Sequence, residues 1–137
     1  MGDMMLERVI ESLKQEEGFR GIPYKDTLGI LTIGYGTKLP LTKEEAEILL
    51  KYRLDEKILE ISEKEPFFLD LPQEAQEVIA NMAYQLGVGG VLKFKKMWAA
   101  LKKGDYQKAA DEMLDSKWAK QTPNRARRLA EIIRSLG

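Results

Sequence analysis

The sequence lacks both cysteine and histidine among its 137 residues. Without cysteine there can be no disulfide framework and no thiolate nucleophile. Without histidine there is no histidine-based catalytic triad, and the two absences together exclude nearly every structural zinc site. Acid and base chemistry in this protein is therefore left to aspartate, glutamate, lysine and tyrosine side chains.

Long apolar runs are missing as well. No stretch of the sequence approaches the roughly 20 apolar residues that span a bilayer. The N-terminal segment MGDMMLERVIESLKQ lacks the continuous apolar core of a signal peptide. We therefore expect synthesis in the cytoplasm and no stable membrane insertion. A hydrophobic content of 44% is typical of a globular protein with a real core, and the chain length predicts one domain.

The charges balance in number but are distributed unevenly along the chain. There are 22 lysines and arginines and 22 aspartates and glutamates, yet residues 71–137 carry twelve basic and seven acidic side chains. A basic C-terminal half favours an anionic partner. A nucleic acid is one such partner, but the net charge of zero and the absence of a known reader motif argue against sequence-specific DNA binding.

The first part of the chain predicts one helix followed by a small region of strands. Residues 3–17 carry apolar side chains at helical spacing. Residues 18–41 combine short β-branched and aromatic runs with several glycines, and the tetrapeptide at 26–29 (DTLG) is typical of a tight turn. We interpret this region as a small β-hairpin lobe.

The rest of the chain predicts helices only. Residues 42–45 (TKEE) form a capping box that opens a long amphipathic helix over 42–64. Residues 66–137 have the pattern of a helical bundle with short turns. The expected helices of this bundle cover 72–86, 91–103, 105–115 and 123–136, the last with Thr122 as its N-cap.

Glu17 is the first candidate for chemistry. On a helical projection it falls inside the apolar arc formed by Leu6, Val9, Ile10 and Leu13. A carboxylate on the buried side of a helix, close to the negative end of the helix dipole, is costly when ionised, which suits a general acid. The alternative is a glutamate that extends into solvent or forms a structural ion pair, and helical geometry by itself favours that alternative.

Asp26 is the second candidate. An aspartate before Thr-Leu-Gly is most often a turn residue that accepts hydrogen bonds from its own backbone. Spacing alone therefore does not identify an enzyme.

Three motifs, in this order, resemble the phage-type lysozymes, a family of endolysins with muramidase activity. Residues 17–36 (EGFRGIPYKDTLGILTIGYG) are similar to the active-site segment of that family. Residues 81–94 (NMAYQLGVGGVLKF) are similar to its central helix and the following turn, and residues 116–126 (SKWAKQTPNRA) to its C-terminal signature. The motifs together cover most of the chain outside the long helix.

The resemblance implies the reaction and three catalytic residues. Hydrolysis of a glycosidic bond needs a protonated acid on the leaving oxygen and a second carboxylate near the anomeric carbon. By resemblance Glu17 is the general acid, and Asp26 with Thr32 positions the water of an inverting mechanism. The substrate implied is the β-1,4 bond between N-acetylmuramic acid and N-acetylglucosamine, with no metal and no organic cofactor.

Further residues follow from the resemblance as binding or orienting groups. Arg125 stands in the first turn of a helix, where the dipole disfavours a cation, and the resemblance implies that it orients Glu17 through an ion pair. The alternative is a solvated arginine. Gln85 is implied to face the cleft and bind the glycan, and Tyr24 and Asn124 are weaker candidates of the same kind.

Two departures from the family pattern affect the outer part of the cleft. Thr37 stands where the family has a histidine after its strand, and only residues 38–41 separate this position from the capping box. Both changes bear on outer saccharide contacts and leave the three catalytic positions intact. Trp118 and Phe94 are expected in the core, because buried aromatic side chains outnumber those that stack on a ligand.

We therefore expect a mainly helical α+β, lysozyme-like fold in one domain, 1–137. A small β-hairpin lobe (18–41) and a helical-bundle lobe (66–137) flank a cleft, helix 42–64 links them, and helix 3–17 packs with the C-terminal lobe. The resemblance implies a monomer that acts on peptidoglycan glycan strands and depends on a holin-like membrane permeabiliser. A lysozyme-like protein that binds peptidoglycan without cleaving it is the alternative.

Overall fold

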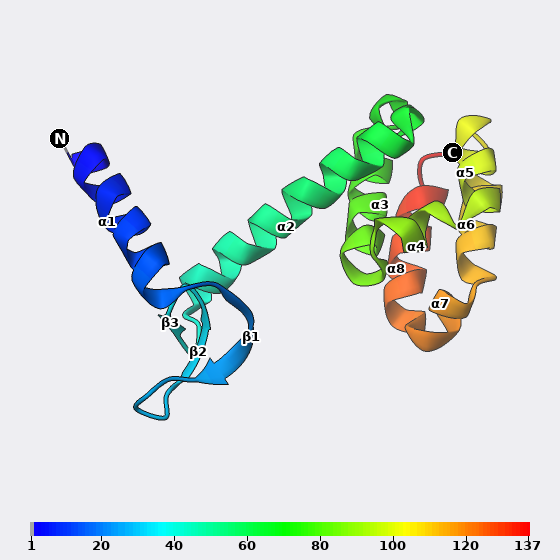
Figure 1. The fold of residues 1–137 in the computed structure, drawn as a ribbon. Helices are drawn as coiled ribbons and strands as arrows, with labels where there is room; N and C mark the ends of the chain where they lie inside the picture. Colours follow the sequence, from blue (N-terminus) through cyan, green and yellow to red (C-terminus); the bar gives the residue numbers. More distant parts are fainter. Residues whose placement is uncertain (1) are drawn as a thin grey trace. The chain divides into compact units, whose positions relative to one another are not determined.

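The computed structural model describes residues 2–137 and divides the chain into two units, Met1–Ile48 and Leu49–Gly137, here called unit 1 and unit 2. The structure is mainly helical with one small antiparallel sheet, which confirms the α+β class. The elements, shown in Figure 1, are α1 (Gly2–Glu17), β1 (Arg20–Lys25), β2 (Leu31–Gly34), β3 (Thr37–Lys38), α2 (Lys43–Lys64), η1 (Pro66–Asp70), α3 (Gln73–Leu86), α4 (Val88–Leu92), α5 (Lys95–Lys102), α6 (Tyr106–Leu114), α7 (Lys117–Gln121) and α8 (Pro123–Arg134).

Helix α1 ends at Glu17, as the sequence predicts. Gly18 follows with a φ of 70°, and its N–H donates to the carbonyl of Lys14 at 3.0 Å, so the helix stops at a glycine in the left-handed region. The apolar stripe of α1 is exposed, and none of its residues is buried. Within unit 1 the sheet meets only the last turn of α1 and Glu17 is exposed, so the burial expected for Glu17 stays a prediction.

Unit 1 contains a three-stranded antiparallel sheet in the order β1-β2-β3. The turn at 26–29 joins β1 to β2, as expected, with the Gly29 N–H donating to the Asp26 carbonyl at 2.9 Å. Thr32 pairs with Tyr24 on β1 and with Lys38 on β3. Directly paired residues in an antiparallel sheet share a face, so these three side chains leave the sheet on the same side.

The capping box of α2 is confirmed. The Glu45 N–H donates to Thr42 Oγ1 at 3.1 Å, and the Thr42 N–H donates to Glu45 Oε1 at 2.8 Å. Two backbone donors that the helix cannot satisfy itself are thereby paired. Ile61, close to the end of α2, is fully buried in the core of unit 2.

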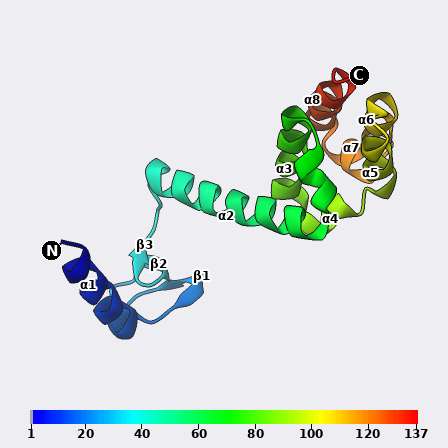
Figure 2. The same ribbon diagram turned by 90° about the horizontal axis from the view of Figure 1, so that it is seen from above.

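The core of unit 2 lies among η1, α2 and the helices α3 to α8. Helix α8 packs against both α3 and α6, and α6 packs against α5 (Figure 2). The largest fully buried apolar side chains are Phe68, Ile61, Ile79, Met82, Met97, Leu101, Met113, Ile133, Val78 and Val91. Within residues 2–137, no helix combines the length and the apolar character that crossing a bilayer requires.

The single helix expected over 91–103 is wrong, because the chain forms α4 and α5 with a break between them. The Val91 carbonyl accepts from the Phe94 N–H at 3.2 Å and from the buried indole N–H of Trp98 at 3.1 Å. These bonds replace the bond that a continuous helix would make at this carbonyl. Thr122 does precede α8, but its hydroxyl donates to the Trp118 carbonyl at 3.1 Å and does not cap the helix.

Replacing Ile79 by alanine should destabilise unit 2 by about 2–5 kcal/mol, because it removes apolar contacts and leaves a cavity at a fully buried position. The control is Ile132→Ala on α8, where the side chain is 40% exposed and the loss should stay below ~1 kcal/mol. Both tryptophans belong to unit 2, so urea unfolding followed by tryptophan fluorescence reports on this unit. Equal losses for the two variants would contradict the assigned core.

Candidate active site

The Glu17 carboxyl group lies against a glycine of the β2–β3 turn. A Cβ atom at position 36 would be 2.6 Å from Glu17 Oε2 and 2.7 Å from its Cδ. Gly36 also has a φ of 72°, which side chains other than hydrogen disfavour. The backbone favours glycine at position 36, and a larger residue there would also displace the end of the Glu17 side chain. The close approach places the end of α1 over this turn of the sheet.

Asp26 is held by three donors. Its Oδ1 accepts from the backbone N–H groups of Leu28 and Ile30, both at 2.9 Å, and its Oδ2 forms an ion pair with the Lys38 ammonium. The hydrogen bond from Lys38 is the largest influence that lowers the pKa of Asp26, the Ile30 and Leu28 N–H groups add to it, and burial opposes them. Asp26 is therefore ionised at neutral pH. The turn-residue interpretation of Asp26 is confirmed, and the side chain has a further partner besides the turn.

Lys38 was missed by the sequence analysis. It stands on β3, a strand of two residues, and pairing with β2 brings it across from Thr32. Its hydrogen bond to Asp26 raises the pKa of Lys38, burial opposes this, and electrostatic interactions with Asp26, Glu17 and Tyr24 act in the same direction as the hydrogen bond. No motif signals this residue. Its role depends on a strand too short to show a period-2 pattern.

Thr32 is the one buried polar residue among residues 2–137, with 1% of its surface exposed. Its hydroxyl donates to the carbonyl of Ile30 at 2.9 Å. The hydroxyl proton is therefore already used in this hydrogen bond, and toward any other group the oxygen can only accept a hydrogen bond. Tyr24, paired with Thr32 across the sheet, is half-buried, and the guanidinium of Arg20 lies over its ring at 4.4 Å.

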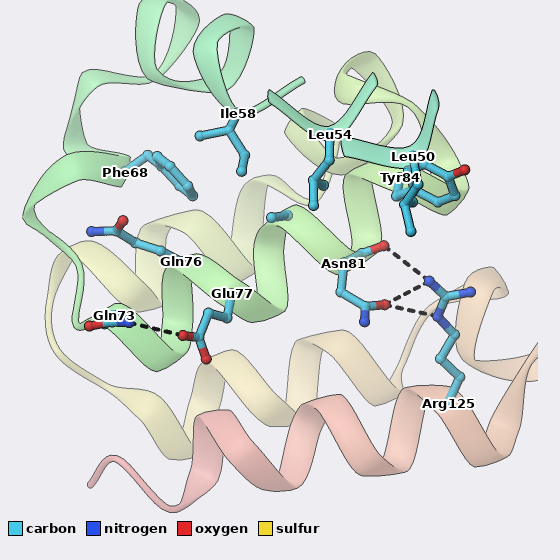
Figure 3. Close-up of a pocket in the computed structure, with 11 residues that line it drawn as sticks. Leu50, Leu54, Ile58, Phe68, Gln73, Gln76, Glu77, Asn81, Tyr84 and Arg125 are labelled. Atoms are coloured by element: carbon cyan, nitrogen blue, oxygen red, sulfur yellow. Dashed lines mark hydrogen bonds between the residues drawn. The ribbon is translucent and has the colours of Figure 1, made fainter. Parts of the chain in front are cut away.

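In unit 2, Arg125 on α8 binds Asn81 on α3. Its Nε donates to Asn81 Oδ1 at 3.0 Å, and its Nη2 donates to the same oxygen at 2.6 Å and to the Asn81 carbonyl at 3.1 Å. Figure 3 shows this pair at one end of a pocket of about 460 Å³. The pocket is lined by Leu50, Leu54, Ile58, Phe68, Gln73, Gln76, Glu77, Ala80, Asn81, Tyr84 and Arg125. Among residues 49–137, no carboxylate forms an ion pair with Arg125, so a neutral amide holds this cation.

Gln85 and Asn124 make local contacts within unit 2. Gln85 Oε1 accepts from the indole N–H of Trp118 at 2.9 Å, and the amide NH₂ of this exposed residue is left for another acceptor. Trp118 is buried as expected, with Phe94 packed edge-on against it at 6.0 Å between ring centroids. Asn124 Oδ1 accepts from the guanidinium of Arg127 on the same helix.

Unit 1 therefore contains four of the predicted residues. Glu17, Asp26 and Tyr24 all contribute to the raised pKa of Lys38, and Thr32 pairs with Lys38 across the sheet. The other three, Arg125, Gln85 and Asn124, belong to unit 2.

Comparison with known proteins points to one family. The family model described as phage lysozyme matches residues 14–133. The pre-baseplate central spike protein Gp5 of Enterobacteria phage T4 is 34% identical, over 90% of this chain and 27% of that protein. Probable T4-type lysozymes 1 and 2 of Dictyostelium discoideum are 31% and 26% identical, each over 94% of this chain and 95% of its own length. The chain thus spans about a quarter of the spike protein and nearly all of each lysozyme.

The contact at Gly36 gives a direct test of where Glu17 lies. Gly36→Ala should destabilise the protein by the ~1–2 kcal/mol that a left-handed backbone costs an alanine, and its methyl group should displace the Glu17 carboxyl that it overlaps. The matched control is Gly34→Ala, since Gly34 has a φ of 70° and open space around it. Amide resonances of Glu17 and Lys38 should shift in the first variant only. Glu17 resonances that move no more in Gly36→Ala than in Gly34→Ala would refute the placement.

Proposed function

The chain belongs to the phage lysozyme family and is a glycoside hydrolase of the muramidase class; we propose that it cleaves the β-1,4 bond between N-acetylmuramic acid and N-acetylglucosamine with inversion. Glu17 is the general acid, and Asp26 with Thr32 positions the attacking water. The observation that carries this assignment is that the Glu17 carboxyl group lies against Gly36 of the β2–β3 turn, while Lys38, two residues further along, forms an ion pair with Asp26.

The two carboxyl groups have different surroundings, which supports different roles. Asp26 accepts three hydrogen bonds and is stabilised as an anion. Within residues 2–48, no hydrogen bond or ion pair holds the Glu17 carboxyl. A pair of carboxyl groups in unlike environments is how glycosidases separate the acid from the base. Glu17 is accordingly the group that can hand a proton to the leaving sugar oxygen.

The hydrogen bonds of Asp26 also support a water-mediated mechanism. Both of its oxygens accept hydrogen bonds from fixed donors, which hold the carboxylate in one orientation toward a water molecule. Accepting a hydrogen bond from water requires only a remaining lone pair. The Thr32 hydroxyl, whose proton is committed to the Ile30 carbonyl, can accept a second hydrogen bond from the same water. Inversion follows if this water attacks on the face opposite the leaving group.

Arg125 is the proposed orienting residue for Glu17. The cation is held by an amide alone within unit 2, which supports a further anionic partner. We also propose that α1 packs with the helical lobe through its apolar stripe. Gln85, Tyr24 and Asn124 are kept as substrate-binding candidates.

The protein acts on bacterial peptidoglycan as its family does, and we propose that it does so as a monomer. The excess of basic side chains in residues 71–137 supports attraction to a wall rich in carboxylates. Release to the wall, after synthesis in the cytoplasm, is proposed to depend on a holin-like membrane permeabiliser.

Clearing of a bacterial cell-wall suspension tests the catalytic assignment. Glu17→Gln keeps the side-chain shape but cannot donate the acidic proton, so clearing should slow by about 10²–10⁴-fold, and Asp26→Asn should also be strongly impaired. Glu16→Gln is the matched control on the same helix turn and should clear at the wild-type rate. Circular dichroism checks that each variant is folded.

Two outcomes would contradict this function. A Glu17→Gln variant that clears as fast as the wild type would refute the general acid. A wild-type protein that sediments with the wall but never lowers its turbidity would instead be a non-catalytic peptidoglycan-binding protein.

A double-mutant cycle tests the proposed Arg125–Glu17 pair. Unfolding free energies of Glu17→Gln, Arg125→Ala and the double variant should show a coupling of about 0.5–3 kcal/mol, because each change removes the same ion pair. The cycle of Glu17→Gln with Arg128→Ala, an exposed arginine on the same helix, should show none. Zero coupling in the Arg125 cycle would eliminate the orienting role.

A further inference from the structure

Lys38 is a charged residue of the catalytic sheet that the proposed reaction leaves without a role. We propose that Lys38 is a positioning residue, which fixes the Asp26 carboxylate in its ionised form and in one orientation. This inference rests on the proposed function and deepens it.

The geometry gives Lys38 one firm partner. Its Nζ donates a hydrogen bond to Asp26 Oδ2, the carboxylate oxygen that accepts no hydrogen bond from the backbone of the turn. The side chain of Asp26 is 15% exposed and that of Lys38 is 54% exposed, so the carboxylate is the sheltered member of the pair. The Lys38 backbone is in turn fixed, because β3 pairs with β2 at Thr32 and the next residue, Leu39, donates to the Leu31 carbonyl at 2.9 Å. An ammonium carried by a paired strand therefore determines where Asp26 Oδ2 lies.

Three groups face Lys38 from the elements around it. They are Asp26 in the turn after β1, Glu17 at the end of α1 and Tyr24 on β1. Lys38 donates to Asp26 and makes no hydrogen bond to Glu17 within residues 2–48. The cation therefore fixes the Asp26 carboxylate and leaves the Glu17 carboxyl group without a hydrogen bond from Lys38.

Removal of the Lys38 cation should shift the pKa of Asp26 in a predictable direction. Lys38 is the largest influence that lowers the pKa of Asp26, so its loss raises that pKa toward the ordinary aspartate value. Activity requires an ionised Asp26, so the acidic limb of the pH profile moves to higher pH. The loss also frees Oδ2 to rotate, which lowers kcat more than it raises KM, because Lys38 is assigned no contact with the substrate.

The experiment compares Lys38→Met, Lys38→Gln and Lys38→Arg in the full-length protein. The Asp26 carboxyl is titrated by carbon-detected NMR, and kcat and KM are measured against pH on soluble peptidoglycan fragments. We expect Lys38→Met and Lys38→Gln to raise the Asp26 titration midpoint and to lower kcat by about 10- to 100-fold with KM nearly unchanged. Lys38→Arg keeps the charge and should restore most of both properties.

Lys25→Met is the matched control, since it removes an exposed lysine of β1 next to Asp26 that forms no ion pair in the described part of the chain. It should leave the titration and kcat unchanged. An unmoved Asp26 midpoint in both neutral variants overturns the proposal, and so does a moved midpoint with unchanged kcat. A wild-type protein without hydrolysis would defeat the proposed function instead, while the NMR titration would still report on the Lys38–Asp26 pair.

Discussion

Three hydrogen bonds to one carboxylate, that of Asp26, organise the small sheet. Two of them, from Leu28 and Ile30, close the turn between β1 and β2. The third, from Lys38, joins this turn to β3. The Asp26 side chain that shapes the lobe is therefore also the proposed catalytic anion. The structure of the lobe depends on whether Asp26 is ionised.

The Asp26–Lys38 ion pair therefore stabilises the folded protein only within a pH window, whose two limits follow from the two pKa shifts. The pKa of Asp26 is lowered in the folded protein, so its contribution to stability is present above the ordinary aspartate value and is lost as pH falls through the folded value. The pKa of Lys38 is raised, so its contribution is present below the ordinary lysine value and is lost as pH rises through the folded value. Between these limits the sheet and the ionised form of Asp26 support one another.

Local chemistry explains which features the sequence could predict. The capping box at Thr42 and the turn at Asp26 depend on side chains that bond to the backbone within a few residues, so both motifs can be recognised in the sequence. The Lys38–Asp26 pair joins residues twelve apart through a strand of two residues, which no periodicity reveals. Burial of Glu17 was inferred from helix periodicity, which shows that α1 is amphipathic but not what covers it. The break between α4 and α5 depends on the indole of Trp98, seven residues from the carbonyl that it binds.

We propose a division of labour in which Glu17 supplies a proton and Asp26, held at both oxygens, acts on water. If water rather than Asp26 attacks the anomeric carbon, the bond to the sugar breaks with inversion. The anomeric configuration of the first product, observed by proton NMR before mutarotation, tests this most directly. The account predicts that cleavage of the β-linked glycan releases the α-anomer of the new reducing end. Initial release of the β-anomer would show a covalent intermediate and contradict the account.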